Sequence, residues 1–463
     1  MAADPHTIAD LSRALKARET TAEAVVERCL QRIAERNATL NAFIAVFGDE
    51  AREQARAADR DIAAGRHRGP LHGVPISLKD LFDVRGAPTT AASRVREDHV
   101  ADADAPSVAA LRDAGAIIIG KTNLHEFAFG TTNEDSAFGP ARHPLDPDRS
   151  PGGSSGGSAA SVADGMCFAS LGTDTGGSIR IPSAVCGLVG LKPSFGELST
   201  DGVVPLSATL DHIGPICRSV DDAAMLYDVL LGGGARPAGK PTDPRALRLG
   251  IPRAYFLSVL DPQVASAFDS ACERLREAGA TLVDVPIPHA GDVAAIYLHI
   301  VLTEAAAYHA KTLERRPEDY TPNVRIRLEM GRYVLGEDYA RAMRGRELIR
   351  REVDAALEGR DGLFLPALAI PAPKLGVAMV RVGAVEEPVR NVMLRCTQAF
   401  NVSGHPAMSI PCGATTDGLP IGAQLVGGYG DTPGLLRVAR AVEPIVAAGA
   451  TAHAGYLGPG TSR

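Results

Sequence analysis

Two clusters of glycine and serine lie close together in this chain, and their serine hydroxyls are groups that can do chemistry. The first cluster reads PGGSSGGS over residues 151–158, and the second reads GTDTGGSIRIPS over residues 172–183. A Gly/Ser tract is usually a flexible linker, but sequence that should form helix or strand borders both clusters. A serine becomes a nucleophile when a nearby base accepts its proton. We therefore expect the clusters to meet in the fold and to form a serine-based hydrolytic site.

Two other interpretations of these clusters are weaker. A glycine-rich turn at a helix start can bind phosphate, but neither cluster has the GxxxxGK[ST] or GxGxxG pattern. Residues 152–156 do match GxSxG, the nucleophile elbow, in which the serine follows a buried strand directly. The preceding RHPLDPDRSPGG is too rich in proline to be that strand. The GxSxG match is therefore interpreted as accidental.

Several long segments resemble the amidase signature family. In chain order they are GVPISLKD (73–80), PGGSSGGSAA (151–160) and GTDTGGSIRIPS (172–183). Three further segments are similar, CGLVGLKPSFGELSTDGVVPLSATLDHIGP (186–215), TQAFNVSGHPAMSIPCG (397–413) and LPIGAQLVG (419–427). The resemblance is dense over residues 70–230, returns over about 360–445, and is thin between 290 and 355. Long motifs in the same order are far more specific than one short pattern.

The resemblance implies a Ser–Ser–Lys triad without histidine. Ser178 would be the nucleophile, Ser154 the bridging serine held by a cis peptide, and Lys79 the base. Ser154 would relay the proton of Ser178 to Lys79, and backbone N–H groups would hold the oxyanion. The implied oxyanion hole consists of Thr175, Gly176, Gly177 and Ser178. The matched residues expected to brace the loops are Ser155, Asp174 and Arg180.

Lys79 can act as a base only when its amine is neutral. The ordinary lysine pKa is ~10.4, and lowering it to ~7 costs about 4.6 kcal/mol. Burial behind an apolar strand shifts the pKa in this direction. The apolar neighbours available for burial are Val74, Ile76, Leu78 and Leu81. Asp80 and Asp83 would oppose the shift if they faced inward, so we expect them to point away. The alternative S-x-x-K arrangement does not occur in the chain.

The family resemblance leaves three functions open. The family contains amidases for small, aryl, peptide and fatty amides, carbamate-cleaving enzymes, and the glutaminase subunit of a tRNA-dependent amidotransferase. We expect a free-standing amidase that cleaves a carboxylic amide, and aryl amides, esters or urethanes as well. The alternatives are an amidotransferase subunit, active only with partners, and an inactive binding protein of the same fold. The residues predicted to line the substrate pocket are Phe127, Phe129, Gly130, Tyr308 and Tyr333.

Alternating helix and strand patterns predict an α/β fold, a large mixed, mostly parallel sheet with helices on both faces. We expect one domain over 1–463, with helices in 1–65, the catalytic motifs in 66–235, and a helical pocket wall in 290–358. Helices are predicted within 7–38 (two, capped by Thr7 and Thr21) and over 106–115, 155–164, 178–186, 221–232, 262–278 and 431–447, with another from 122 to 129. Strands are predicted at 116–119, 166–171, 247–252, 280–286, 363–365, 407–410 and 421–426.

Composition restricts the partners and the location of the protein. The 463 residues carry a net charge of −7, which argues against nucleic acid and anionic membranes as partners. No run of 18 apolar residues and no signal-peptide pattern occurs, so we expect a cytoplasmic protein. Seven cysteines without a CxxC pair predict buried free thiols. We expect no metal or cofactor, a small-molecule amide or carbamate substrate, and a monomer or homodimer.

Overall fold

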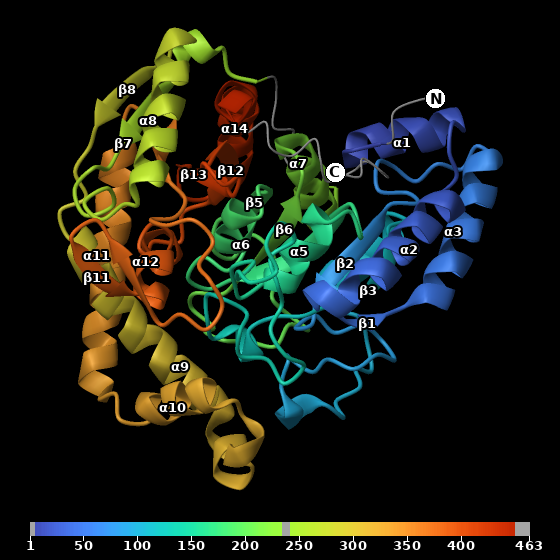
Figure 1. The fold of residues 1–463 in the computed structure, drawn as a ribbon, viewed down its shortest axis with the longest axis horizontal. Helices are drawn as coiled ribbons and strands as arrows, with labels where there is room; N and C mark the ends of the chain where they lie inside the picture. Colours follow the sequence, from blue (N-terminus) through green and yellow to red (C-terminus); the bar gives the residue numbers. More distant parts are fainter. Residues whose placement is uncertain (1–4, 234–240, 450–463) are drawn as a thin grey trace.

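An eleven-stranded sheet runs through the middle of the molecule in the computed structural model, which describes residues 5–233 and 241–449 (Figure 1). In spatial order its strands are β1 (Phe43–Val46), β3 (Ile117–Thr122), β2 (Pro75–Lys79), β4 (Ala169–Asp174), β6 (His212–Cys217), β5 (Val189–Lys192), β12 (Ala407–Ala414), β13 (Pro420–Val426), β9 (Gly362–Pro366), β7 (Arg248–Ile251) and β8 (Thr281–Asp284). The predicted domain over 1–463 extends beyond the described residues at both ends.

The sheet is mixed, as predicted, but it is not mostly parallel. Four neighbouring pairs are parallel, β3–β2, β2–β4, β9–β7 and β7–β8. The remaining six pairs in the described sheet are antiparallel. Within this centre β12 and β13 form a hairpin, which a short turn can close only between antiparallel strands. The sequence predictions include neither β5 nor β6, which complete that centre.

Helices cover the sheet, and most follow the predicted segments. They are α1 (Ile8–Ala17), α2 (Ala22–Leu40), α3 (Gly48–Ala63), α4 (Pro106–Asp113), α5 (Gly156–Ala163), α6 (Arg180–Val185), α7 (Val220–Leu230), α8 (Pro262–Glu277), α9 (Val293–Arg315), α10 (Pro322–Gly331), α11 (Gly336–Leu357), α12 (Val389–Leu394), α13 (Gln398–Val402) and α14 (Thr432–Val446). Thr7 and Thr21 cap α1 and α2, as predicted, because each hydroxyl accepts a backbone N–H three residues on. The predictions place helices in 1–65 without giving the bounds of α3, and they include neither α12 nor α13.

The helix predicted from residue 122 to 129 does not form. β3 continues to Thr122, and only a short 3₁₀ turn, Glu126–Ala128, follows. Phe127 inside that turn has φ 49°, which a right-handed helix does not allow. The His125 N–H instead donates to the Ser154 carbonyl at 3.0 Å. The segment therefore contacts the first Gly/Ser cluster rather than its own preceding turn.

The parallel strands β2 and β4 position the site. All five residues of β2 are buried, and β2 pairs with β4 from Ile76–Ala169 to Leu78–Leu171. Because the strands are parallel, Lys79 and Asp174 at their carboxyl ends lie at the same edge of the sheet. The helices α5 and α6 begin within the two Gly/Ser clusters, at Gly156 and Arg180. The sheet edge thus brings both clusters to the end of β2.

The helices α9, α10 and α11 confirm the helical segment predicted over 290–358, and they extend away from the sheet in Figure 1. Residues 290–315, which include α9, are long and apolar enough to cross a membrane by length and composition. That criterion alone is weak, because a core helix also meets it. Here α9 contacts α10, α11 and α13 within the fold.

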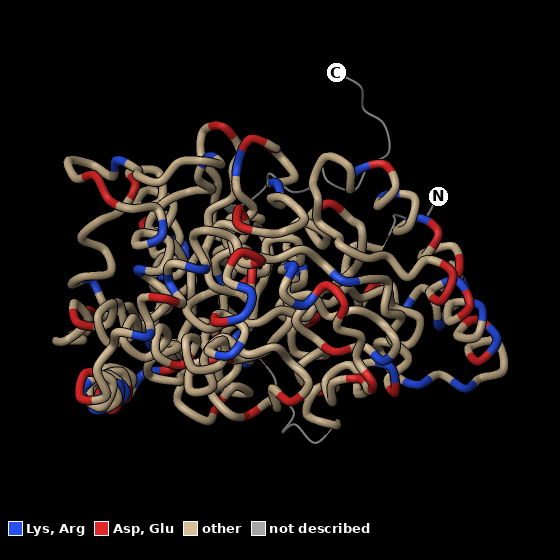
Figure 2. Tube along the Cα trace, turned by 90° about the horizontal axis from the view of Figure 1, so that it is seen from below, with Lys and Arg blue, Asp and Glu red and all other residues tan. Residues whose placement is uncertain are grey.

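Neither the charged residues nor the cysteines are concentrated on one helix or strand. Lysine and arginine alternate with aspartate and glutamate along the described trace (Figure 2). All seven cysteines are buried and free, as predicted. Within the described residues, no group of three or more His, Cys, Asp or Glu side chains could hold a metal ion.

Candidate active site

Lys79 is the last residue of β2 and is completely buried. Its Nζ donates a hydrogen bond to Ser154 Oγ at 2.7 Å and another to Thr173 Oγ1 at 2.6 Å. The structure therefore brings Lys79 to the first Gly/Ser cluster, across 75 positions of sequence. Thr173, on β4, is a partner that sequence reasoning did not identify.

The surroundings of Lys79 favour its neutral form. Burial lowers its pKa to about 7, while the carboxylates of Asp211 and Asp174 oppose this shift. Asp80 points away from Lys79, as expected. Its carboxylate forms an ion pair with Lys121 at 2.8 Å and accepts the Thr90 backbone N–H at 3.0 Å. The nearest carboxylate in sequence therefore does not keep Lys79 charged.

The first cluster forms a tightly enclosed loop ahead of α5. The peptide bond between Gly153 and Ser154 is cis, as the family resemblance implies. A Cβ atom on Gly153 would lie 2.8 Å from the backbone nitrogens of Thr132 and Asn133. Only glycine permits so close an approach of two backbone segments. The loop is thus fixed where Ser154 Oγ meets Lys79.

The second cluster forms the turn between β4 and α6. The carbonyl oxygen of Ser178 accepts the Ser155 backbone N–H at 3.3 Å, which joins the two clusters directly. Ser155 Oγ donates to the Thr173 carbonyl at 3.2 Å. Gly177 has φ +141°, and a Cβ atom there would clash with Thr397. The expectation that the two clusters meet in the fold is therefore confirmed.

Asp174 and Arg180 form a fully buried ion pair at the base of this turn, at 2.9 Å. Burial alone would raise the pKa of Asp174, but the adjacent Arg180 holds it well below its usual range. Arg180 also donates to Gln424 Oε1 and Asn401 Oδ1, both at 2.6 Å, and to the Thr397 carbonyl at 3.0 Å. The pair links the turn to α13 and β13.

Sequence reasoning missed the distant members of this network. Asn401 and Gln424 lie inside the quoted segments TQAFNVSGHPAMSIPCG and LPIGAQLVG, but they are 221 and 244 positions from Arg180. A polar residue within a largely apolar run was the available signal. Spacing alone gave no reason to pair either of them with Arg180.

Asp211 is a half-buried carboxylate near Lys79 that sequence reasoning did not single out. It accepts Thr175 Oγ1 at 2.6 Å and the backbone N–H groups of Leu206 and Ser207 at 2.8 and 3.0 Å. Burial raises its pKa to about 6, and the charge of Lys79 opposes the rise. Asp211 therefore ties the turn at Thr175 to the segment 206–211.

A cavity of about 320 Å³ reaches this part of the site. Thr173, Thr175 and Asp211 line it together with the segment 200–206. The residues predicted to line a substrate pocket are Phe127, Phe129, Gly130, Tyr308 and Tyr333, and none of them lines this cavity.

The structure separates those five residues into two environments. Phe127 is buried with its ring 4.3 Å from that of His309, and Phe129 is buried beneath Arg327. Gly130 is packed against the His125 ring. By contrast Tyr308 is 45% exposed and Tyr333 is 84% exposed. The turn after α10 directs Tyr333 outward, so that ring does not shield an apolar cavity.

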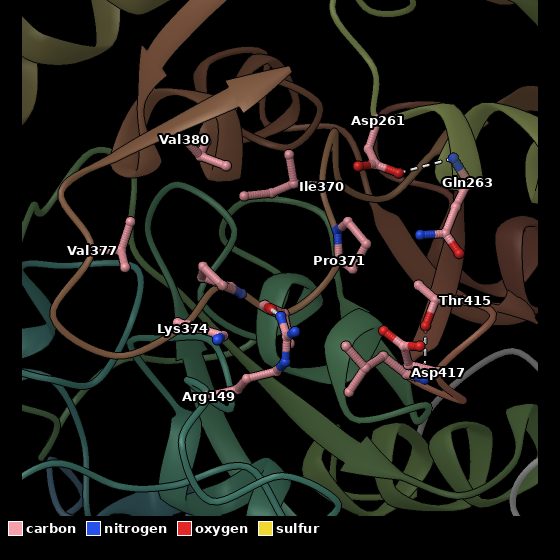
Figure 3. A pocket seen from close by; sticks show the side chains of 13 residues that line it. Arg149, Asp261, Gln263, Ile370, Pro371, Lys374, Val377, Val380, Thr415 and Asp417 are labelled. Carbon is pink, nitrogen blue, oxygen red and sulfur yellow. Dashed lines mark hydrogen bonds between the residues drawn. The ribbon is translucent and has the colours of Figure 1, made fainter. Parts of the chain in front are cut away.

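A second cavity of about 320 Å³ lies outside the catalytic loops (Figure 3). Arg149 and Lys374 lie on one side of it, and Asp261 and Gln263 lie across from them. Its wall is joined to the residue that precedes the first cluster, because Ser150 N–H donates to the Pro373 carbonyl at 2.9 Å. None of the predicted site residues lines it.

Comparison with known proteins agrees with this geometry. The family model described as Amidase matches residues 24–436. A protein of Pseudomonas putida named Amidase is 42% identical over 434 residues, covering 89% of this chain and 90% of that protein. A protein of Anaeromyxobacter sp. (strain K), named as a subunit of glutamyl-tRNA(Gln) amidotransferase, is 41% identical over 465 residues, covering 92% of this chain and 93% of that protein.

A solved structure extends the agreement to the fold. A crystal structure of an amidase superposes with a TM-score of 0.90 at 38% identity, covering 95% of this chain and 100% of that chain. The matches span the sheet, both Gly/Ser clusters and the distant network around Arg180. The chain therefore belongs to the amidase family and is an amidohydrolase.

Proposed function

We propose that this protein is a free-standing amidase that hydrolyses a carboxylic amide through an acyl-enzyme on Ser178. One observation carries the proposal: buried Lys79, with its pKa lowered to about 7, is hydrogen-bonded to Ser154 at 2.7 Å. A lysine in this state exchanges protons near neutral pH, as a general base must. Ser154 is in turn next to Ser155, which bonds to the Ser178 carbonyl.

The proposed reaction begins when neutral Lys79 takes the proton of Ser154 as Ser154 takes the proton of Ser178. Ser178 Oγ then attacks the amide carbon and forms a tetrahedral intermediate. The proton returns through Ser154 to the leaving nitrogen, the C–N bond breaks, and an amine departs. Water then attacks the ester by the same relay and releases the carboxylic acid, which regenerates Ser178.

Backbone donors are available for the oxyanion of that intermediate. The N–H groups of Thr175, Gly176, Gly177 and Ser178 donate to no acceptor among the described residues. The Gly176 carbonyl, in contrast, accepts Thr397 Oγ1 at 2.6 Å, which restrains the turn. Unpaired donors in a restrained turn are what oxyanion stabilisation requires. The same chemistry would act on esters and urethanes, which also have a carbonyl and a leaving group.

The test is hydrolysis of an amide, ester and carbamate panel by the purified protein, with the released amine identified by mass. Ser178→Ala should abolish turnover, and Lys79→Ala should lower kcat by at least about 10³-fold, because each removes a member of one relay. Exposed Lys311 on α9 provides the control, Lys311→Ala. Near-normal rates for Lys79→Ala at pH 7 would rule out the assigned base.

A second candidate is the glutaminase subunit of an amidotransferase, because relatives of that name are about as similar as the amidase from P. putida. Such a protein would act only within its complex. Glutaminase activity that appears only after co-purification with partner subunits, with an inactive isolated chain, would favour this alternative. Turnover of simple amides by the isolated chain would reject it.

A further inference from the structure

The cavity outside the catalytic loops carries charges of both signs on its walls, and the mechanism above does not use it (Figure 3). Its volume of about 320 Å³ lies at the small end of the range for ligand sites, roughly 300–1,000 Å³. Arg149 and Lys374 lie on one side. Asp261 and Gln263, at the start of α8, lie across from them, with Asp417 below on the same side.

The positively charged side offers donors that the described residues do not use. Arg149 Nε donates to Asp146 at 2.9 Å and its Nη1 donates to the Ala372 carbonyl at 2.7 Å, which holds the guanidinium in place. Its Nη2 donates to no acceptor in the described part of the chain. Lys374 is the antiparallel backbone partner of Arg149, and its exposed Nζ forms no hydrogen bond or ion pair with a described residue. One fixed guanidinium and one free ammonium therefore line the cavity.

The opposite side offers acceptors and one amide donor. Asp261 Oδ1 caps α8 by accepting the Gln263 backbone N–H at 2.8 Å. Gln263 Oε1 accepts the Thr416 N–H at 2.8 Å, so the Gln263 Nε2 remains available. Asp417, in the turn between β12 and β13, is exposed and accepts no hydrogen bond from the described residues. Within the described chain no ion pair shorter than 4.0 Å joins the two sides, so the opposite charges do not neutralise one another.

Apolar side chains form much of the remaining wall. They are Ile370, Pro371, Val377, Val380 and Leu419. Val377 is 40% exposed, so part of this apolar wall is open to solvent. Covering such a surface with an apolar group of a ligand is favourable. The cavity therefore combines a side that suits an anion, a side that suits a cation, and an apolar wall.

We propose that this cavity is a binding site, separate from the catalytic centre, for a small zwitterion with an apolar side chain, such as a free α-amino acid of the size of leucine. The ligand carboxylate binds Arg149 and Lys374 through charge-assisted hydrogen bonds. The ligand ammonium binds the carboxylates of Asp417 and Asp261, and the side chain packs on the apolar wall. A simple anion meets the two carboxylates and a simple cation meets the two basic groups, so a zwitterion is the class that satisfies both sides.

The test is isothermal titration calorimetry of the purified full-length chain with L-leucine and with two analogues that each lack one charge. These are 4-methylpentanoate, which lacks the ammonium, and 3-methylbutylamine, which lacks the carboxylate. We expect one equivalent of leucine to bind with a Kd of about 1 mM or lower, and each analogue to bind about 10-fold more weakly. The measurement needs no turnover, so it does not depend on the proposed amidase function.

Two variants assign each charge of the ligand to its side of the cavity. Lys374→Gln removes a cation and should weaken leucine binding about 10-fold while sparing 3-methylbutylamine. Asp417→Asn removes an anion and should weaken leucine binding by a similar factor while sparing 4-methylpentanoate. The matched controls are Arg381→Gln and Glu386→Gln, which should keep the wild-type Kd. These two exposed residues lie on the hairpin strands β10 (Met379–Val382) and β11 (Val385–Pro388) and do not line the cavity.

Each possible outcome decides the inference. The absence of leucine binding would overturn it, and equal affinity for leucine and 4-methylpentanoate would overturn the zwitterion as the ligand class. Leucine binding that is unchanged in both Lys374→Gln and Asp417→Asn would place the site elsewhere and overturn it as well. Both side chains are exposed, so the variants should fold, and thermal melts check this. A lack of amide turnover in the same preparation would contradict the proposed function and leave the binding result standing.

Discussion

The protonation state of Lys79 decides when the proposed relay can operate. A lysine with an ordinary pKa of ~10.4 would be almost fully charged at pH 7 and could not accept a proton. Complete burial brings the pKa of Lys79 to about 7, even though Asp211 and Asp174 raise it. Burial therefore has the larger effect on the pKa of Lys79, and the two carboxylates make the downward shift smaller.

Replacing Asp211 should move the pH dependence of the reaction. In the wild type, kcat/KM should fall below about pH 7, because Lys79 becomes protonated as the pH drops through its pKa. Asp211→Asn removes a charge that raises this pKa, so the midpoint of the acid limb should shift to lower pH. The measurement is a pH–rate profile with a neutral amide from pH 5 to 9.

Asp201 offers a matched control for this shift. It lines the same cavity but is exposed, and Asp201→Asn should keep the wild-type midpoint. Asp174 also acts on the pKa of Lys79, and Tyr297 lies within electrostatic reach of Asp211; both residues stay unchanged in both variants. If Asp211→Asn lowers the rate equally at every pH, Asp211 only supports the turn mechanically.

Hydrogen bonds through the segment 206–211 connect α9 to the catalytic turn. Glu304 on α9 accepts Ser207 Oγ at 2.5 Å and both the N–H and hydroxyl of Thr209, at 3.1 and 2.8 Å. Tyr339 on α11 donates to the same carboxylate at 2.9 Å. Asp211 then continues the path to Thr175. The helical segment is thus coupled to the site although it lies outside the sheet.

Glu304→Gln should loosen that coupling. Loss of the charged acceptor weakens several hydrogen bonds at once, and we expect a fall in unfolding free energy of about 1–3 kcal/mol. Hydrogen exchange of the amides in 206–211 should accelerate more than that of α9 itself. Glu314→Gln, on the same helix but 63% exposed, should change stability by less than about 0.5 kcal/mol. Unchanged exchange in 206–211 would argue against the coupling.

Local pattern accounts for the elements that were predicted and for those that were not. Signals within a few residues, burial and helix starts, account for the apolar run ending in Lys79 and for the helices that begin in both Gly/Ser clusters. By contrast, Val189–Lys192 and His212–Cys217 contain glycine, proline and lysine, which weaken a strand signal. These two segments form strands because the adjacent strands on both sides supply their backbone hydrogen bonds. The helix expected from 122 was lost to a tertiary contact with Ser154.

Arg180 holds together parts of the chain that are far apart in sequence. It is fully buried, and its acceptors come from Asp174 beside it and from Thr397, Asn401 and Gln424. The sequence could indicate Lys79, Ser154 and Ser178, because each lies in a motif with a recognisable neighbourhood. It could not indicate which distant polar side chains complete the support, since no spacing rule covers more than 200 positions.

Removing Arg180 should destabilise the whole fold. Arg180→Met leaves Asp174 buried and unpaired, and we expect a loss of about 3–5 kcal/mol at pH 7. Because the folded-state pKa of Asp174 is depressed, this stabilisation exists above the ordinary aspartate pKa and is lost as the pH falls. Denaturant melts at pH 7 and pH 3 should show a smaller difference at pH 3, which lies below the ordinary aspartate pKa.

A double variant separates the pair from the packing around it. Asp174→Asn combined with Arg180→Met should be more stable than the sum of the two single losses predicts, because the stranded charge is gone. Strict additivity would show that the ion pair itself contributes little.

The reach of Arg180 also has a consequence for the order of events during synthesis. Gln424 lies 244 positions after Arg180, and ribosomes add about 5–20 residues per second. For roughly 10–50 s a growing chain carries all three reactive side chains but lacks the groups that fix the turn around Ser178. A nascent chain would therefore remain catalytically silent until its last strands emerge, and hydrolysis would begin only in the finished molecule.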